Sequence, residues 1–416
     1  MTIKRYATLA AASLACISST NAFSGPPSLL TFLVQSTSHK TTNTLVGNSP
    51  YSTSLFSTPP ERNDDTSPPP PPLSTLVSRV AVAGATGRTG KFVVQSLLSQ
   101  KVPVLALVRD PSKASTVLDD PTDELLTIRK TDLGSRNDVL AALDENQCDA
   151  AIWCATGFSD APDQSIWTKL QALFGLAVTP KGTIDAVGLP ALAEGLKSTP
   201  KRVLDGKSLP KIVMLSSAGV TRPSWSEGKK LALEGCAGIP IVRLNPFGIL
   251  DVKRESEETL RTCGVDYTIF RPCGLNDSWP SNQRPIFSQG DIAVGRINRK
   301  DVAQILVSIL SAPDATGKTF EAITIANSDG YYPPASSLNT ALGRLESDSI
   351  NGGKGPSEEV VRATYALMQQ LLPGEKQSAN ELAMGQTYEQ LDKGEEGRLG
   401  KKGEEKVEQA GLAPSS

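Results

Sequence analysis

A glycine-spaced turn joins an apolar run to an amphipathic segment in the stretch VAVAGATGRTG, residues 80–90. The apolar run predicts a buried strand, and residues 88–100 predict a helix. The turn carries Gly84, Gly87 and Gly90 in the spacing GxxGxxG. This spacing permits a tight turn, a close approach of phosphates and close packing of helix on strand. Because N–H groups at a helix N-terminus bind a pyrophosphate, the stretch predicts a dinucleotide site. A glycine-rich turn without a ligand is the alternative.

Apolar runs alternate with helical patterns over residues 76–330, which we expect to form one folded domain. Strands are expected at residues 104–108, 125–128, 150–153, 211–215, 265–270 and 320–325. Helices are expected at residues 138–143, 191–196, 251–262 and 302–310, the last with Asp301 as its N-cap. Alternation of this kind predicts an α/β fold, a doubly wound parallel sheet of the Rossmann type with helices on both faces.

Further candidate cofactor residues lie in the turn and after the next strands. Arg109 closes the second strand, where an arginine suits a 2′-phosphate and an acidic residue would suit ribose hydroxyls. With Lys113 as a second cation, NADP is favoured over NAD, and a solvated surface arginine is the alternative. Asp132 and Leu133 follow the third strand, where an adenine ring would be held, although Asp132 is equally suited to cap the next helix. The remaining candidates are Thr86, Arg88, Thr89, Ala155, Thr156 and Gly157.

The composition excludes several classes of function. A net charge of −2 argues against nucleic acid as the main partner. The single histidine, His39, lies in a segment that we expect to be removed, which excludes histidine catalysis and histidine metal ligation. The six cysteines form no CxxC pair, so no metal site is expected. No run of about 18 apolar residues follows the N-terminus, so no transmembrane segment is expected in the mature chain.

The first 75 residues predict targeting segments and a linker. Lys4 and Arg5 precede an apolar stretch and small residues, the order of a secretory signal peptide over residues 1–22. Residues 23–60 lack Asp and Glu and are rich in Ser and Thr, which predicts a transit peptide. The junction at Phe23 resembles the bipartite presequences of algae with secondary plastids, which implies the chloroplast stroma; secretion is the alternative. Residues 61–75 are proline-rich and predict an extended linker.

Several stretches together resemble the atypical short-chain dehydrogenase/reductase family, in its NmrA-like NAD(P)-binding branch. They are VAVAGATGRTG, LVRDPSKA, VMLSSAGV, ILDVKRESEETLRTCGVDYTIFRPCGL and RKDVAQILVSIL. The resemblance covers roughly residues 76–325 and is specific for the family, not for a substrate. The stretch that begins at Ile249 is especially similar to plastid members of this branch.

Active members of this family use a YxxxK pair and a serine, with the tyrosine as the acid that protonates a carbonyl oxygen. The resemblance makes Lys253 and Ser217 the candidate catalytic residues, and Lys253 and Ser216 candidate cofactor ligands. A solvated helix lysine and a strand-end serine are the alternatives. Ile249 stands four residues before Lys253, where the family has its tyrosine, and isoleucine has no proton to donate.

That departure leaves two main functions open, and an isomerase or dehydratase that recycles its cofactor is a more distant third. The first is a redox-responsive regulatory or assembly factor of the plastid that binds NADP and a protein partner. The second is an NADPH-dependent oxidoreductase that acts on a small hydrophobic carbonyl or quinone. Tyr267 is a conceivable substitute acid, but core packing is favoured for it. Arg271 suits either an anionic ligand or a buried salt bridge.

Two segments remain without an assigned role. Residues 160–180, after the fourth strand, form a lid, a partner surface or a family-specific loop. The C-terminal extension, residues 331–416, contains one helical pattern at residues 357–372, which we expect to dock on the domain. Its predicted apolar side consists of Val360, Ala363, Leu367 and Leu371. From Glu375 onward the composition predicts a flexible tail.

Overall fold

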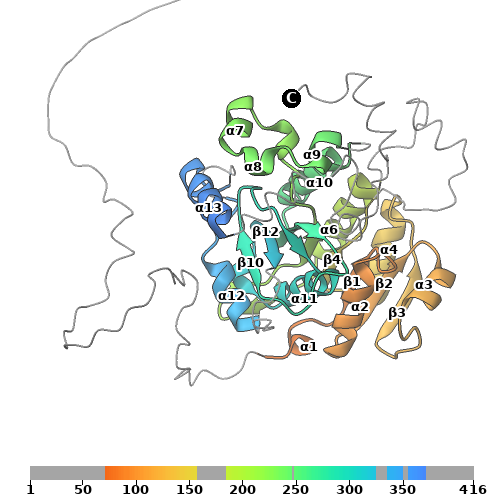
Figure 1. Cartoon of the computed structure of the whole chain (residues 1–416). Helices are drawn as coiled ribbons and strands as arrows, with labels where there is room; N and C mark the ends of the chain where they lie inside the picture. The colour runs from red at the N-terminus through yellow and green to blue at the C-terminus, as the bar shows by residue number, and fades with distance from the viewer. Residues whose placement is uncertain (1–70, 157–183, 246–247, 325–334, 350–354, 372–416) are drawn as a thin grey trace, which may run out of the picture. The chain divides into compact units, whose positions relative to one another are not determined.

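The structure is a computed structural model that describes residues 71–156, 184–245, 248–324, 335–349 and 355–371 (Figure 1). The leader, most of the linker, Gly157, residues 160–180 and the chain beyond residue 371 lie outside the described residues. Expectations for those segments therefore stay predictions. Within the described ranges, none of the helices combines the length and the apolar character that a bilayer-spanning segment needs.

Eight strands form one sheet in the order β10-β12-β8-β7-β4-β1-β2-β3. They are β1 (Val80–Ala83), β2 (Val104–Val108), β3 (Leu126–Lys130), β4 (Ala150–Trp153), β7 (Ile212–Leu215), β8 (Tyr267–Pro272), β10 (Pro285–Ser288) and β12 (Lys318–Thr324). All neighbours pair in parallel except β10, which is antiparallel to β12 at the edge. From β1 the chain winds outward to β2 and β3 and then back to β4, β7 and β8. The predicted doubly wound parallel sheet is confirmed, and its switch point lies between β1 and β4.

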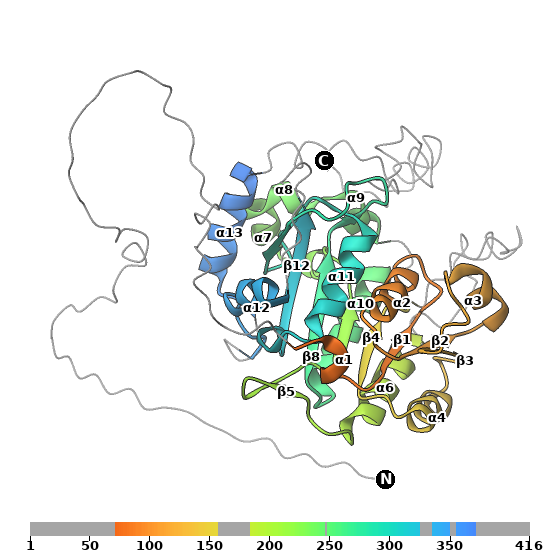
Figure 2. The ribbon, with the colours of Figure 1, turned by 90° about the horizontal axis from the view of Figure 1, so that it is seen from below.

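Helices cover both faces of the sheet. They include α2 (Gly90–Ser99), α3 (Pro111–Val117), α4 (Arg136–Asn146), α6 (Leu189–Lys197), α10 (Ile249–Thr262) and α11 (Arg299–Ile309). In β1, Val80 and Val82 pack in the apolar cluster that contains α2 and α11, which lie side by side (Figure 2). Ala81 and Ala83 pack in the cluster that contains α4 and α6. Because both faces are buried, each central strand consists almost entirely of apolar residues.

Shorter elements extend from the edges of the sheet. They are α1 (Leu73–Leu76), η2 (Ile184–Gly188), β5 (Val203–Leu204), β6 (Lys207–Ser208), η3 (Arg222–Ser224), α7 (Glu227–Ala232), α8 (Glu234–Ala237), α9 (Pro240–Leu244), β9 (Gly274–Leu275), β11 (Arg296–Ile297), η5 (Pro313–Ala315), α12 (Ala335–Gly343) and α13 (Glu358–Leu371). The helix α13 agrees with the helical pattern expected at residues 357–372.

Several local expectations differ from the structure, among them the apolar side expected for α13, since Val360 and Ala363 are exposed. Asn298, not Asp301, caps α11, because the Asn298 side chain accepts a hydrogen bond from the N–H of Lys300 at 2.8 Å. Asp301 lies in the first turn and is fully buried. Leu73 falls within the predicted linker, yet it is buried in α1 against the core of the sheet.

Candidate functional site

The glycine turn lies at the switch point, where β1 ends and α2 begins. Gly84 has φ +77°, and a Cβ on it would lie 2.8 Å from the backbone nitrogen of Ala155, which follows β4. A Cβ on Gly90 would lie 2.1 Å from the Gly84 carbonyl oxygen. The Gly87 N–H donates to that same oxygen at 2.9 Å, and a Cβ on Gly87 would meet only this atom, at 3.0 Å. The turn therefore requires Gly84 and Gly90 for packing, whereas Gly87 leaves its exposed side open.

The N-terminus of α2 faces this open side without a side-chain cap. Thr89, the N-cap residue, makes no capping hydrogen bond, and the first turn of α2 has no acidic residue. Arg88 lies in the turn itself and forms an ion pair with Asp277 at 3.2 Å. The helix dipole and the Arg88 guanidinium both favour an anion at this position.

Two cations lie at the rim beyond β2. Arg109 directly follows β2 and Lys113 lies on α3, and both are exposed. Between them, Asp110 caps α3 by accepting hydrogen bonds from the N–H groups of Ser112 at 2.9 Å and Lys113 at 3.4 Å. In the part of the chain that the structure describes, neither Arg109 nor Lys113 forms an ion pair. Both therefore retain their charge for an anionic group on a ligand.

The residues expected beside the adenine ring follow β3, and the small residues expected beside the cofactor follow β4. Both groups therefore lie at the carboxyl edge of the sheet. Asp132 accepts a hydrogen bond from the Gly134 N–H at 2.8 Å, and it does not cap α4, because Ser135 does. Leu133 packs its backbone against Gly188: a Cβ on Gly188 would lie 2.5 Å from the Leu133 carbonyl oxygen. Ala155 is buried under Gly84, and Thr156 is exposed beside it.

Lys253 extends from α10 to the carboxyl ends of β4 and β7. Its Nζ donates to the Leu215 carbonyl oxygen at 3.3 Å. Burial raises the pKa of the Cys154 thiol to about 12, and the nearby Lys253 ammonium opposes this rise. Ile249, one turn earlier, packs in an apolar cluster with Val220, Val242 and Leu250. The lysine therefore lies at the ligand edge of the sheet, while the position of the family tyrosine is part of an apolar cluster.

Ser216 belongs to a buried network under this edge. Its Oγ donates to Glu257 Oε1 at 2.6 Å, and Arg271 Nε donates to the same oxygen at 2.8 Å. Burial alone would raise the pKa of Glu257, but Arg271, Arg261 and Ser216 hold it below its usual value. Of the alternatives for Arg271, the structure shows the buried salt bridge. Ser217 is half-buried, and its Oγ donates to the Ala218 carbonyl oxygen at 3.0 Å.

Tyr267 lies at the opposite end of the sheet from Lys253. It begins β8, and its hydroxyl donates to Asp348 Oδ2 at 2.9 Å. Burial and the Asp348 carboxylate both raise the pKa of Tyr267. Since Lys253 contacts the carboxyl ends of the strands, Tyr267 cannot supply the proton that the family tyrosine supplies.

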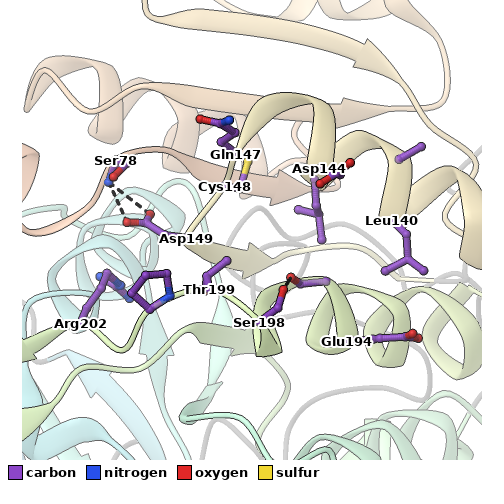
Figure 3. Close-up of a pocket in the computed structure, with 14 residues that line it drawn as sticks. Ser78, Leu140, Asp144, Gln147, Cys148, Asp149, Glu194, Ser198, Thr199 and Arg202 are labelled. Atoms are coloured by element: carbon purple, nitrogen blue, oxygen red, sulfur yellow. Dashed lines mark hydrogen bonds between the residues drawn. The ribbon is translucent and has the colours of Figure 1, made fainter.

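A cavity of about 770 Å³ also opens at the amino end of the sheet (Figure 3). Asp149 and Ser78 line it, and the Asp149 carboxylate accepts two hydrogen bonds from the Ser78 N–H at 3.0 and 3.2 Å. Because these residues precede β4 and β1, the cavity lies away from the glycine turn. Within the described ranges, no three His, Cys, Asp or Glu side chains are grouped to hold a metal ion.

Residues 84–313, more than half of the chain, match a family model described as NAD(P)H-binding. The chain belongs to this NAD(P)H-binding family. The match contains the glycine turn, Arg109 and Lys253, so the expected resemblance to the NmrA-like branch of the atypical short-chain dehydrogenases is confirmed. The family is defined by NAD(P)H binding, and the open glycine turn is the feature of this chain that suits such binding.

Several relatives of this NAD(P)H-binding chain are chloroplastic proteins. An uncharacterized chloroplastic protein of Arabidopsis thaliana, At2g34460, is 30% identical over 60% of this chain and 77% of its own. The chloroplastic protein TIC 62 of Pisum sativum is 23% identical over 63% of this chain but only 46% of its own length. A short-chain dehydrogenase/reductase from Veillonella parvula, solved with NADP, is 14% identical over 61% of this chain and 98% of its own, with a TM-score of 0.43.

Two groups at the site were missed by the sequence analysis. Asp277 pairs with Arg88 of the glycine turn and, at 2.8 Å, with Arg299 of α11. Glu257 accepts hydrogen bonds from both Ser216 and Arg271. The Arg88–Asp277 pair spans 189 positions of the chain. Periodicity and motif spacing carry no signal at that separation.

Proposed function

We propose that this protein binds NADP(H) at the carboxyl edge of β1, β2 and β4 and acts in the plastid as a redox-responsive regulatory or assembly factor. The observation that carries the proposal is the pairing of an open glycine turn with Ile249. The turn suits a dinucleotide, while the position that supplies the family's proton belongs to an apolar cluster.

The residues around the turn fit the parts of NADP(H) in sequence along the edge. The pyrophosphate is assigned to the N–H groups of Thr86, Arg88, Thr89 and Gly90, because the Gly87 N–H is already donated to the Gly84 carbonyl oxygen. Arg109 and Lys113 suit the 2′-phosphate, because each is an exposed cation without an ion pair among the described residues. Lys253, held at the Leu215 carbonyl oxygen, suits the hydroxyls of the nicotinamide ribose. When bound, the cofactor supplies hydride chemistry, and the chain supplies binding and orientation.

Proton supply separates this protein from an ordinary carbonyl reductase. Ser216 is engaged by Glu257, Ile249 has no proton to give, and Tyr267 lies at the far end of the sheet. In the described residues, then, no phenol stands in the family's relation to Lys253. A cofactor that binds one conformation of the protein more tightly than another shifts their populations without turning over, and a plastid partner that binds only one of them responds to this shift.

The second candidate function is an NADPH-dependent oxidoreductase for a small hydrophobic carbonyl or quinone. The position of Lys253 at the ligand edge favours it. In this case the proton comes from water or from a group other than tyrosine.

The proposed location is the chloroplast stroma. The chloroplastic relatives support it, and so does the acid-poor sequence of residues 1–60. Fluorescence of the full chain fused to a reporter in an alga with secondary plastids tests the presequence. Signal in the secretory pathway alone would contradict the stromal assignment.

Calorimetry and turnover on the full chain separate the two functions. The control is Gly87→Asp, which places a carboxylate on the open side of the turn with a single close backbone contact. We expect the wild type to bind NADPH and the variant to lose binding at least tenfold, because the carboxylate repels phosphate. With a panel of quinones and carbonyls, we expect no NADPH oxidation above the Gly87→Asp background. Oxidation by the wild type alone would establish the oxidoreductase, and no NADPH binding would end both proposals.

A further inference from the structure

The C-terminal helix α13 docks on an apolar seat built by segments that follow β7 and β8. Val361 is 5% exposed and packs in a cluster with Trp225 and Ile292. Met368 is 6% exposed and packs in a second cluster with Ala218 and Cys273. Both views show α13 beside α7 and α8 (Figures 1 and 2). We use the name seat for the residues of these two clusters other than those of α13.

The seat is held in shape by buried polar groups that do not involve α13. Asp291 accepts hydrogen bonds from the N–H groups of Gly219 at 2.6 Å and Thr221 at 2.7 Å. Arg222, fully buried, donates to the carbonyl oxygens of Asp291, Cys236 and Ala293 at 2.7, 2.7 and 2.8 Å. Glu321 accepts from the N–H of Asp291 at 2.8 Å. These hydrogen bonds hold the backbone of the seat in place without any contribution from α13.

The attachment of α13 itself rests mainly on apolar contact. The contacting side chains, Val361, Tyr365 and Met368, have the spacing i, i+4, i+7 of one helix face. Among the described residues, one hydrogen bond joins them to the segment beside the seat, from the N–H of Gly235 in α8 to the Tyr365 hydroxyl at 2.9 Å. The sequence just before the helix, NGGKG at 351–355, is rich in glycine. A preformed seat and an amphipathic helix are the two parts of helix-in-groove recognition.

The seat adjoins the candidate site on its acceptor side, by which we mean the side at the carboxyl ends of β7 and β8, where a hydride acceptor would lie beside the nicotinamide. Ala218 directly follows Ser217, and Cys273 comes two residues after Arg271, where β8 ends. Ligands of doubly wound sheets bind outside these carboxyl ends. The helix α13 also lies beyond residues 84–313, which match the family. Most of the seat lies within the matched residues, except Ile323, and the helix that covers it lies beyond them.

We propose that α13 is a releasable cover, docked in cis, that occludes the acceptor side of the nucleotide site from bulky ligands and partner helices. The assignment of the covered surface to the acceptor side rests on the proposed function, whereas the docking of α13 does not. The cover leaves by detaching its Val361–Met368 face, while the polar network keeps the seat intact.

Thiol labelling of the full chain tests the cover, because two buried cysteines lie in the seat and one lies far from it. Cys236 and Cys273 belong to the seat, with exposures of 0% and 7%, and Cys148 is 2% exposed at the amino end of the sheet. Labelled sites are assigned by mass spectrometry. Val361→Arg places a charge in the seat, and Val360→Arg, at a neighbouring position that is 40% exposed, is the matched control.

We expect Cys236 and Cys273 to react faster than Cys148 in the wild type, and at least tenfold faster again in Val361→Arg. Cys148 and the Val360→Arg protein should not change. A peptide of residues 356–372 added to Val361→Arg should restore protection. The proposal would be overturned by unchanged labelling in Val361→Arg or by a peptide that gives no protection. It would also be overturned by an equal rise at Cys148, because α13 would then unfold together with the core of the domain.

Two further readouts separate the proposals. Protection of the seat that depends on protein concentration would assign α13 to a second copy and overturn docking in cis. NADPH affinity should be unchanged in Val361→Arg, because the glycine turn lies on β1 and α2. If the wild type binds no NADPH but shows the labelling pattern, the proposed function fails and the cover stands.

Discussion

Replacing Arg109 by Asp tests the assignment of this residue to a 2′-phosphate. Arg109 is exposed at the end of β2 and has no ion pair in the described residues, so its loss should change the free energy of unfolding by no more than about 0.5 kcal/mol. The substitution reverses the charge at the position where ribose hydroxyls and a 2′-phosphate differ. Any change in nucleotide affinity therefore reports binding, not folding.

The expected magnitude follows from the two interactions that change. A hydrogen bond to a charged group contributes about 1.5–3 kcal/mol, so its loss together with phosphate repulsion should weaken NADPH at least about tenfold. An aspartate that accepts from ribose hydroxyls contributes about 1 kcal/mol, which should strengthen NADH about fivefold. The NADPH/NADH preference should therefore fall by about fifty-fold or more.

Calorimetric titration of both nucleotides at one ionic strength measures this ratio. Lys101→Asp is the matched control, because it makes the same change of charge before β2, at the opposite end of the strand. Lys101 has φ +58°, a conformation that Asp tolerates. An unchanged ratio in Arg109→Asp, or an equal shift in Lys101→Asp, would refute the assignment.

Two further predictions concern buried carboxylates. Glu257→Gln leaves the Arg271 guanidinium buried without its counter-charge, so we expect a loss of about 3 kcal/mol in urea denaturation; a loss within experimental error would show that the pair is not a structural requirement. Burial raises the pKa of Asp301 from 3.8 to about 6, so the folded state holds this proton more tightly than the unfolded state, and stability is lost as pH rises between these values. The N–H of Asn282, which donates to Asp301 at 2.7 Å, already limits this rise, and the expected effect on stability is about 1–3 kcal/mol. Asp301→Asn should be more stable than the wild type by this amount at about pH 7 and equal to it at about pH 4, and parallel pH profiles of the two proteins would contradict this.

Strands with two buried faces were predictable from the chain itself. β1, β2 and β4 have the predicted bounds, since each is a continuous apolar run, and β1 and β2 are followed by Gly84 and Arg109. β10 was missed, because PIFS has neither alternation nor a long apolar run. It becomes a strand by pairing with β12, which provides its hydrogen-bond partners.

The docking face of α13 shows the limit of periodicity. Val360 and Ala363 are part of the apolar side that the periodicity predicts, yet both are exposed. The docked face carries Val361 and Met368 instead. The helix has apolar residues on more than one side, so the shape of the seat decides: a Cβ on Gly290 would lie 2.7 Å from Val361 Cγ2. The glycine provides the space that Val361 fills.

The amino-acid sequence by itself determined the order of strands and helices and the glycine turn, because these depend on residues within about ten positions of one another. Tertiary structure decided which charged groups meet. Arg88 pairs with Asp277, and Ser216 and Arg271 both bind Glu257. The partners are too far apart in the sequence for a periodic pattern to predict them. The exposed Arg88–Asp277 pair depends on distance in space alone, whereas the buried Glu257 also needs partners to offset the cost of its desolvation. Those quantities exist only after the sheet has brought the carboxyl ends of its strands together.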